Sequence, residues 1–278
     1  MIKAYFQLTR PFNAMAGCIV VLLSGYVART SSWLPVVLAA ITVLLITAST
    51  NAWNDYIDIE IDRVNKPERP LPSGRISPHG ALLFSLVGSA LSLIIAVFIN
   101  QTAFLIVLAS NALLYLYSWK LKCMVLWGNF TVATTVALCF IYGGVAAGNI
   151  QPTLMLALTV FFAMTGREIL LTMADYKGDK QQNCHTISTV WGRNVAGIFV
   201  AVFLGISAIA MFLTYIIQKY NIIYLILVVL IMYPIFIYVS FNALKNGSKQ
   251  LLARSGYLMQ FSYIIWFLAI ALGAGLEV

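Results

Sequence analysis

Long apolar runs constrain this chain more than any other feature of its sequence. A membrane-spanning helix needs about 20 largely apolar residues, and nine runs near that length follow one another along the 278 residues. Only 9% of the residues are charged, whereas soluble domains carry about a quarter. We therefore predict an all-α, polytopic protein with nine transmembrane helices in the lipid bilayer. The runs lie at 13–29, 33–53, 79–99, 102–119, 128–148, 152–174, 195–217, 221–243 and 254–275.

The connections between the runs indicate one domain over residues 1–278. Most are short, and only those near 54–78 and 175–194 are longer and polar. No linker or low-complexity segment interrupts the chain. The N-terminal residues lack the charged start and small-residue cleavage site of a signal peptide, so we expect the first run to be a permanent span.

The four cysteines give little information about a site. Cys18, Cys123, Cys139 and Cys184 are scattered without a CxxC spacing, and only Cys184 has a histidine beside it, His185. A zinc or haem site would have too few ligands. Any bound metal is therefore expected to be one that oxygen ligands suit.

The charged residues predict the orientation and the side of the site. If the N-terminus and every second connection share one side, that side holds all 17 Lys and Arg residues except Arg29 and Lys219. The positive-inside rule then places the N-terminus in the cytoplasm. The same side holds every acidic residue except Glu277, which the rule does not require. We therefore expect a multi-pass protein of the cell membrane whose active site faces the cytoplasm.

The first acidic cluster continues the second apolar run, so we expect it on the end of that helix. Its polar residues recur at three- and four-residue steps, which places them along one helical face. Carboxylates so close together repel one another, and Mg²⁺ removes that repulsion while bridging carboxylates to substrate phosphates. The cluster comprises Asn51, Asn54, Asp55, Asp58 and Asp62.

The second acidic cluster lies at the end of the sixth run. Glu168, Thr172, Asp175 and Asp179 again share one helical face. Glu168 lies about two turns inside its span, where an ionisable group is costly unless it is paired or functional. Two clusters at the ends of spans two and six indicate a site.

Each cluster also has a simpler interpretation. The first could be a solvated helix end whose carboxylates pair with Arg63, Lys66 and Arg69. The second could be an internal pair of Glu168 with a basic residue, followed by ordinary surface aspartates. Basic residues near either cluster could instead anchor the chain at anionic lipid headgroups.

These motifs resemble those of a known family. Asn54-Asp55-x-x-Asp58-x-x-x-Asp62 and Asp175-x-x-x-Asp179 are similar to the two aspartate-rich motifs of the UbiA superfamily of intramembrane prenyltransferases. The similarity covers essentially the whole chain and implies nine helices around a central cavity open to the bilayer. It also extends to Arg10-Pro11-x-Asn13, Asn65-Lys66-Pro67-x-Arg69-Pro70-Leu71-Pro72-Ser73-Gly74, Tyr117-Ser118-x-x-Leu121-Lys122 and Gly128-Asn129.

The resemblance implies a Mg²⁺-dependent transfer of an isoprenyl group from its diphosphate to a lipophilic acceptor. We expect no nucleic acid and no obligatory protein partner. The implied metal-facing residues are Asn54, Asp55, Asp58, Asp62, Asp175 and Asp179. The implied catalytic residues are Asp58, Asp62, Asp175, Asp179 and Lys122. The implied substrate-binding residues are Arg10, Asn13, Asn51, Lys66, Arg69, Tyr117 and Glu168.

We expect the reaction to begin with departure of diphosphate and formation of an allylic cation on the prenyl chain. Mg²⁺ and basic residues would stabilise the leaving group. Aromatic faces can stabilise the cation, although such residues also form membrane-interface belts. The aromatic residues near the motifs are Trp53, Tyr56, Tyr115, Tyr117, Trp119 and Tyr176.

Within the superfamily, the chain most resembles the archaeal-type digeranylgeranylglyceryl phosphate synthases, which implies a geranylgeranyl donor and geranylgeranylglyceryl phosphate as acceptor. It departs from them at Thr172, Lys177 and Asn183, where that group usually has an aspartate, an acidic residue and a glycine. Fewer carboxylates would lower the local negative charge and could change acceptor binding.

Three other functions stay open at this point. The first is a prenyltransferase with an aromatic acceptor, of the quinone or chlorophyll type. The second is a membrane terpene cyclase of the same superfamily, which needs no acceptor. The third is a cation transporter, which is disfavoured because the acids lie at one face of the membrane rather than at its midplane.

Overall fold

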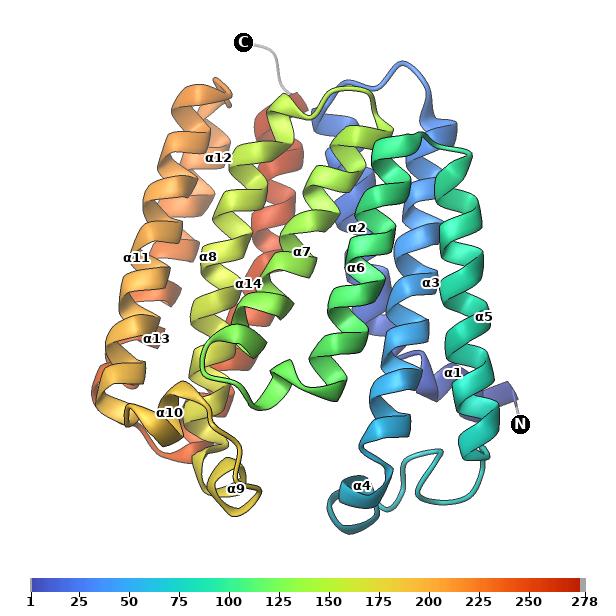
Figure 1. Cartoon of the computed structure of the whole chain (residues 1–278). Coiled ribbons are helices and arrows are strands. Elements are labelled where there is room, and N and C mark those ends of the chain that lie inside the picture. Colours follow the sequence, from blue (N-terminus) through green and yellow to red (C-terminus); the bar gives the residue numbers. More distant parts are fainter. Residues whose placement is uncertain (1, 276–278) are drawn as a thin grey trace. The chain divides into compact units, whose positions relative to one another are not determined.

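The computed structural model describes residues 2–275, and the regular elements in that range are helices (Figure 1). The long helices are α2 (Pro11–Val27), α3 (Trp33–Ile57), α5 (Pro78–Val97), α6 (Gln101–Trp119), α7 (Trp127–Ala146), α8 (Gln151–Ala174), α11 (Arg193–Ile217) and α14 (Lys249–Gly275). One further long stretch combines α12 (Ile222–Leu227), a π-helical segment (Val228–Met232) and α13 (Tyr233–Leu244). The short helices are α1 (Ile2–Leu8), α4 (Ile59–Asn65), α9 (Tyr176–Gln181), α10 (Ile187–Val190) and the 3₁₀ turn Leu121–Cys123.

The predicted all-α membrane fold is confirmed. Within residues 2–275, 8 helical stretches are long and apolar enough to cross a membrane, counting α12 to α13 as one. Helices α1 and α2 meet the same standard only as a pair bent by 57°, which would raise the number to 9. The count of nine spans and the cytoplasmic N-terminus stay predictions.

The bend between α1 and α2 has a local cause. Arg10 adopts the left-handed conformation, with φ 49° and ψ 64°, and Pro11 begins α2. Proline has no backbone N–H to donate to the preceding turn, so it starts helices and does not continue them. The Arg10-Pro11 pair therefore fixes where the helical direction changes.

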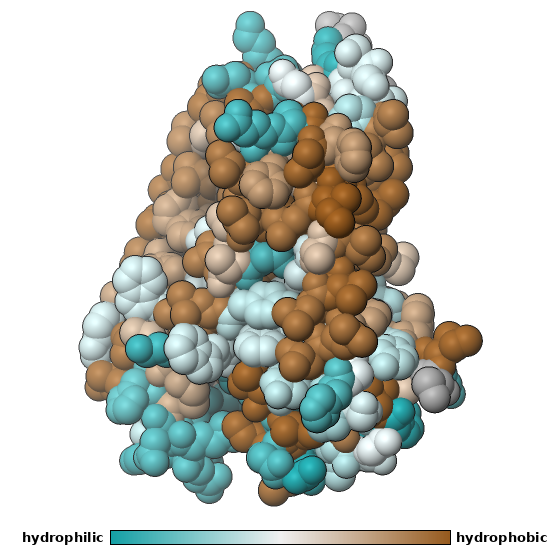
Figure 2. Space-filling view, turned by 45° about the vertical axis from the view of Figure 1, so that its right-hand side comes forward, coloured by the Kyte–Doolittle hydropathy of each residue, from teal (hydrophilic) through white to brown (hydrophobic). Residues whose placement is uncertain are grey.

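Helix α5 shows why the bilayer is the solvent of this fold. The face of α5 that packs inward carries the small residues Ala81, Ser85, Ser89, Ser92 and Ala96. Large apolar side chains point outward instead, with Leu83 63% and Ile94 54% exposed. Small residues at helix contacts and apolar ones facing outward are typical of membrane helices. Figure 2 shows apolar side chains over most of one face.

The chain divides into two compact units, and each contains one acidic cluster. Unit 1 comprises residues 1–120 and 141–150; there α3 packs against α2, α5 and α6. Unit 2 comprises residues 121–140 and 151–278; there α11 packs against α8 and α13, and α14 packs against α8, α12 and α13. A single functional domain over residues 1–278 stays a prediction.

Two glycines of α11 give a test of the packing in unit 2. A Cβ atom at Gly197 would lie 2.7 Å from the carbonyl oxygen of Ala243, whereas one at Gly205 would meet nothing within 4 Å. Backbone cannot move aside as a flexible side chain can. We expect Gly197→Ala to lower the free energy of unfolding by about 1–3 kcal/mol, as overpacking does.

Gly205→Ala is the matched control, because it makes the same change in helix propensity on the same helix. Thermal unfolding in detergent should therefore show a lower Tm for Gly197→Ala and an unchanged or slightly higher Tm for Gly205→Ala. Equal Tm values for the two variants would contradict the close α11–α13 contact.

Candidate active site

The first acidic cluster lies where α3 gives way to α4. We predicted a continuous helix, but the helix breaks at Asp58, whose φ of −87° and ψ of 7° lie in the sparsely populated bridge region. Backbone hydrogen bonds still cross the break: Asp58 N donates to Asn54 O at 2.9 Å and Asp62 N donates to Asp58 O at 2.8 Å. The four-residue spacing is therefore kept although the helix is interrupted.

The buried carboxylates of this cluster include two that are paired with arginines. Asp55, Asp58 and Asp62 are 3%, 9% and 4% exposed. Arg69 Nη1 donates to Asp62 Oδ2 at 2.5 Å and to Asp55 Oδ1 at 3.2 Å, and Arg10 also donates to Asp55. Burial of a charge is costly unless it is paired. The two guanidinium groups therefore allow Asp55 and Asp62 to be buried, and Asp55 is engaged by both of them.

Asn51 and Asn54 connect this cluster to its neighbours. The Asn51 amide donates to the carbonyl oxygen of Thr9 at 3.1 Å, which holds the α1–α2 bend against α3. The Asn54 amide donates to Ser118 Oγ at 3.3 Å, and its oxygen accepts from Arg10 at 3.4 Å. These contacts place Arg10 at the cluster although it is distant in sequence.

The other predicted residues of unit 1 surround the cluster at its edges. Asn13 is exposed near the start of α2, and Lys66 is exposed at the end of α4. Tyr117 is half-buried near the end of α6, next to Ser118. Trp53 stacks on Tyr56 with ring centroids 5.7 Å apart, so an aromatic face lies on the helix that carries the cluster.

The second acidic cluster repeats the backbone arrangement of the first. Helix α8 ends at Ala174, α9 begins at Tyr176, and Asp175 lies between them with φ −91° and ψ 7°. Asp179 N donates to Asp175 O at 3.0 Å across the break. Each motif thus places one aspartate at a helix break and another one turn later. The repeated four-residue spacing was visible in the sequence, but the breaks were not.

Glu168 is paired within its span. Arg167 Nη1 donates to Glu168 Oε1 at 2.8 Å. The same guanidinium donates to the carbonyl oxygen of Gly256 at 3.3 Å and to Gln260 Oε1 at 3.1 Å, both on α14. The pair therefore ties α8 to α14. Thr172, one turn further along α8, shares a hydrogen bond of 3.2 Å with Ser188 of α10.

The electrostatics of Asp179 favour a bound cation. Burial, and to a smaller extent the nearby Asp175, raise the pKa of Asp179 to about 6, although a hydrogen bond from Thr186 and the charge of Lys122 oppose the rise. A raised carboxyl pKa means that the ionised form destabilises the folded protein above the unfolded pKa. A cation beside Asp179 would offset that cost. Asp175 itself is exposed and lies 3.7 Å from Lys249 Nζ.

The ligand chemistry of the two clusters fits Mg²⁺. Their donors are carboxylate and amide oxygens, which hard divalent cations prefer. In the part of the chain that the structure describes, no three or more His, Cys, Asp or Glu side chains are grouped so that they could hold a metal by themselves. Mg²⁺ does not need such a group, because it keeps several waters and uses one or two carboxylates together with substrate phosphates.

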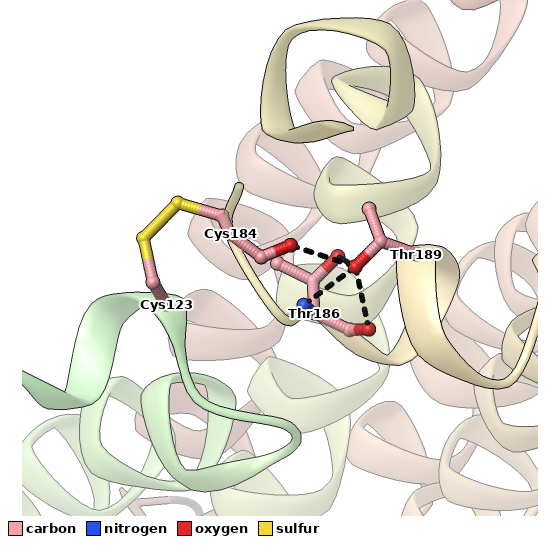
Figure 3. Close-up of a disulfide and its surroundings, with 4 residues drawn as sticks. All are labelled: Cys123, Cys184, Thr186 and Thr189. Carbon is pink, nitrogen blue, oxygen red and sulfur yellow. Dashed lines mark hydrogen bonds between the residues drawn. A yellow bond between two sulfur atoms is a disulfide. The ribbon is translucent and has the colours of Figure 1, made fainter. Parts of the chain in front are cut away.

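A disulfide between Cys123 and Cys184 is a feature that we did not predict (Figure 3). The two residues are 61 positions apart and their Cα atoms are 4.6 Å apart. No spacing motif marked them, because each lies in a separate connection. The bond joins the connection that carries Lys122 to the segment that follows Asp179. Cys18 and Cys139 are not part of a disulfide.

Comparisons with known proteins agree with this arrangement. Residues 14–264 match the UbiA prenyltransferase family. The chain is 32% identical to the digeranylgeranylglyceryl phosphate synthase of Methanosphaera stadtmanae, over 97% of this chain and 98% of that protein. A solved digeranylgeranylglyceryl phosphate synthase structure is 32% identical and covers 98% of both chains, with a TM-score of 0.85.

A second solved structure shares the fold at lower identity. It is a UbiA homologue from Archaeoglobus fulgidus bound to GPP and Mg²⁺, 21% identical over 96% of this chain and 99% of that one, with a TM-score of 0.71. Extended sequence similarity and a common fold over nearly the whole chain lead to one assignment. The chain belongs to the UbiA prenyltransferase family.

Proposed function

We propose that this enzyme transfers a geranylgeranyl group from its diphosphate to geranylgeranylglyceryl phosphate and releases diphosphate, with Mg²⁺ as cofactor. The observation that carries the proposal is the pair of aspartate motifs at helix breaks, each beside basic side chains. A relative with this full-length similarity is named a digeranylgeranylglyceryl phosphate synthase. A structural neighbour binds GPP with Mg²⁺.

We assign the metal-binding role to oxygen donors of both motifs. They are Asn54, Asp58, Asp62, Asp175 and Asp179, with Asp55 at the edge of the set because two arginines already engage it. The metal would neutralise charge on the departing diphosphate. Through its contacts with Arg10 and Arg69, Asp55 holds both guanidinium groups at the first acidic cluster.

Basic residues beside the aspartate motifs would bind the diphosphate oxygens. The planar guanidinium of Arg69 is held in place by its contacts with Asp55 and Asp62. Its forked set of N–H donors matches phosphate geometry. Lys66 is exposed and therefore accessible. Lys122 brings a positive charge close to Asp179. Positive groups positioned before the reaction stabilise the charge that develops on the leaving group.

The bond changes follow from this arrangement. The bond between C1 of the prenyl chain and the diphosphate oxygen breaks, and diphosphate keeps the electron pair. An aromatic face, such as one offered by the stacked pair Trp53 and Tyr56, can stabilise the resulting allylic cation. A hydroxyl oxygen of the acceptor then forms the new bond to C1, and its proton passes to the released diphosphate.

The acceptor is supported by similarity and by charge. Lys177 and Lys180 are exposed on α9, beside the second motif, and a phosphorylated acceptor would be attracted to them. The basic connections also support a cytoplasmic site, by the positive-inside rule. The departures Thr172, Lys177 and Asn183 are the positions at which we expect acceptor preference to differ from that of relatives.

The direct test offers the purified protein, in lipid, geranylgeranyl diphosphate and Mg²⁺ with one of three additions. These are geranylgeranylglyceryl phosphate, 4-hydroxybenzoate or no acceptor. We expect a lipid with two geranylgeranyl ethers from the first only. A prenylated aromatic product would favour the quinone-type function, and a terpene formed without acceptor would favour a cyclase. Chelation of Mg²⁺ should stop diphosphate release.

The aspartates at the helix breaks should be essential for turnover. Asp58→Asn and Asp175→Asn keep the shape of the side chain but remove its charge, so we expect kcat/KM to fall by roughly 10²–10³-fold, as loss of a group that stabilises transition-state charge does. Glu60→Gln is the control, because Glu60 is exposed on α4 and pairs with Arg63 at 2.8 Å. Near-normal Mg²⁺-dependent turnover in either aspartate variant would refute the assignment.

Arg69 and Arg75 test the role of the loop after α4. Arg69→Met removes the guanidinium that joins Asp55 and Asp62, so we expect KM for the diphosphate donor to rise by about 10- to 100-fold, the range for a lost charge-assisted contact. Arg69→Lys should restore only part of the affinity, since lysine lacks the planar fork. Arg75→Met is the control because Arg75 is exposed and contacts Gln7 and Ser73. Similar KM values for Arg69→Met and Arg75→Met would contradict a diphosphate role.

A further inference from the structure

We propose that the Cys123–Cys184 disulfide is a positioning device of the second acidic cluster, which holds Lys122 beside Asp179 for binding of the diphosphate. The inference rests on the proposed function, which gives Lys122 and Asp179 their roles. It assigns to two cysteines, which carry no chemistry in the reaction, a measurable share in substrate affinity.

The disulfide joins two connections of unit 2 that have little regular structure of their own. Cys123 is the last residue of the 3₁₀ turn Leu121–Cys123, which precedes α7. Cys184 is buried in the segment between α9 and α10. A second link lies next to the covalent one, because His185 N donates to the carbonyl oxygen of Cys123 at 3.0 Å. Two adjacent links fix the orientation of the turn as well as its distance.

On the other side, Cys184 is coupled to Asp179 through the backbone. Cys184 N donates to the carbonyl oxygen of Asp179 at 2.9 Å, which closes the end of α9. The next residues also contact the cluster, since the Thr186 hydroxyl hydrogen-bonds the Asp179 carboxyl group. These contacts connect the segment from Asp179 to Thr186 to the carboxylate.

The start of α10 braces this segment. Thr189 Oγ1 donates to the carbonyl oxygen of Cys184 at 2.7 Å, and Thr186 N donates to Thr189 Oγ1 at 2.8 Å (Figure 3). Thr186 and Thr189 together form a capping box on α10, which satisfies backbone donors at the helix start. Cys184 is therefore a fixed point, and the disulfide transfers that rigidity to the turn that carries Lys122.

The side-chain type of Lys122 is one that benefits from such support. A lysine ammonium is a point charge on a flexible four-carbon stem, and ordering its loop and side chain when the ligand binds reduces affinity. Arg10 and Arg69 are held by buried carboxylates. Lys122 is partly exposed, and its charge acts on the partly buried carboxylate of Asp179. Restricting the turn in advance lowers the entropy lost on binding.

The experiment compares Cys123→Ser, Cys184→Ser and the double variant with wild type in the prenyl transfer assay. Non-reducing and reducing mass spectrometry confirms which samples contain the disulfide. We expect KM for geranylgeranyl diphosphate to rise about tenfold in all three variants, with a smaller change in kcat. Dithiothreitol reduces the protein disulfide and is itself oxidised to a cyclic disulfide. It should raise the KM of wild type to that of the variants and leave the KM of the variants unchanged.

Cys18→Ser and Cys139→Ser are the controls, since neither of these cysteines is part of a disulfide. Both control variants should have the wild-type KM, and dithiothreitol should raise their KM as it raises that of wild type. An unchanged KM in the Cys123 and Cys184 variants, whether or not their Tm falls, would overturn the inference and leave the proposed function standing. An inactive wild-type protein would overturn both.

A double-mutant cycle with Lys122→Met separates positioning from general stabilisation. If the disulfide acts through Lys122, Lys122→Met should raise KM much less in the Cys184→Ser background than in wild type. Equal effects in the two backgrounds would show that the disulfide does not act through Lys122 and would overturn the inference. Tm is measured on each variant as well as KM, so a change in KM can be compared with any change in stability.

Discussion

The contact of Arg69 with Asp55 and Asp62 is the interaction on which the first acidic cluster depends. Buried carboxylates on neighbouring turns would repel one another and would lose their hydration. A guanidinium that donates to two of them at once removes both penalties. The same contact brings the loop after α4 back onto the end of α3. Charge balance and backbone position are therefore set by one side chain.

The second cluster has a backbone conformation similar to that of the first, but its carboxylates have different charge partners. Asp58 and Asp175 share nearly the same bridge-region conformation between a long helix and a short one. No arginine contacts Asp175 or Asp179 among the ion pairs of the described residues. Asp179 has a raised pKa instead, and the opposing charge comes from Lys122 on a connection that a disulfide restrains. This cluster therefore has more need of an added cation.

Thr172 illustrates how a change of residue type alters the surroundings of a motif. Its hydroxyl bonds to Ser188 and to the carbonyl oxygen of Ile169, so two neutral groups meet at the contact between α8 and α10. A carboxylate there would add a negative charge close to Asp175 and would require a further partner. The neutral pair relieves this requirement, and it is consistent with a site in which Lys177 adds positive charge on α9.

Much of this protein followed from the sequence, because crossing a bilayer is a local requirement. Apolar length alone predicts helices such as α5 and α8, and the four-residue spacing of Asp58 with Asp62 and of Asp175 with Asp179 predicts two carboxylate clusters. Tertiary structure decided which charges meet. Arg10 reaches Asp55 only because the chain bends at Pro11, and Cys123 reaches Cys184 only because two distant connections come together. Such contacts depend on how the chain returns on itself, which no local pattern of residues specifies.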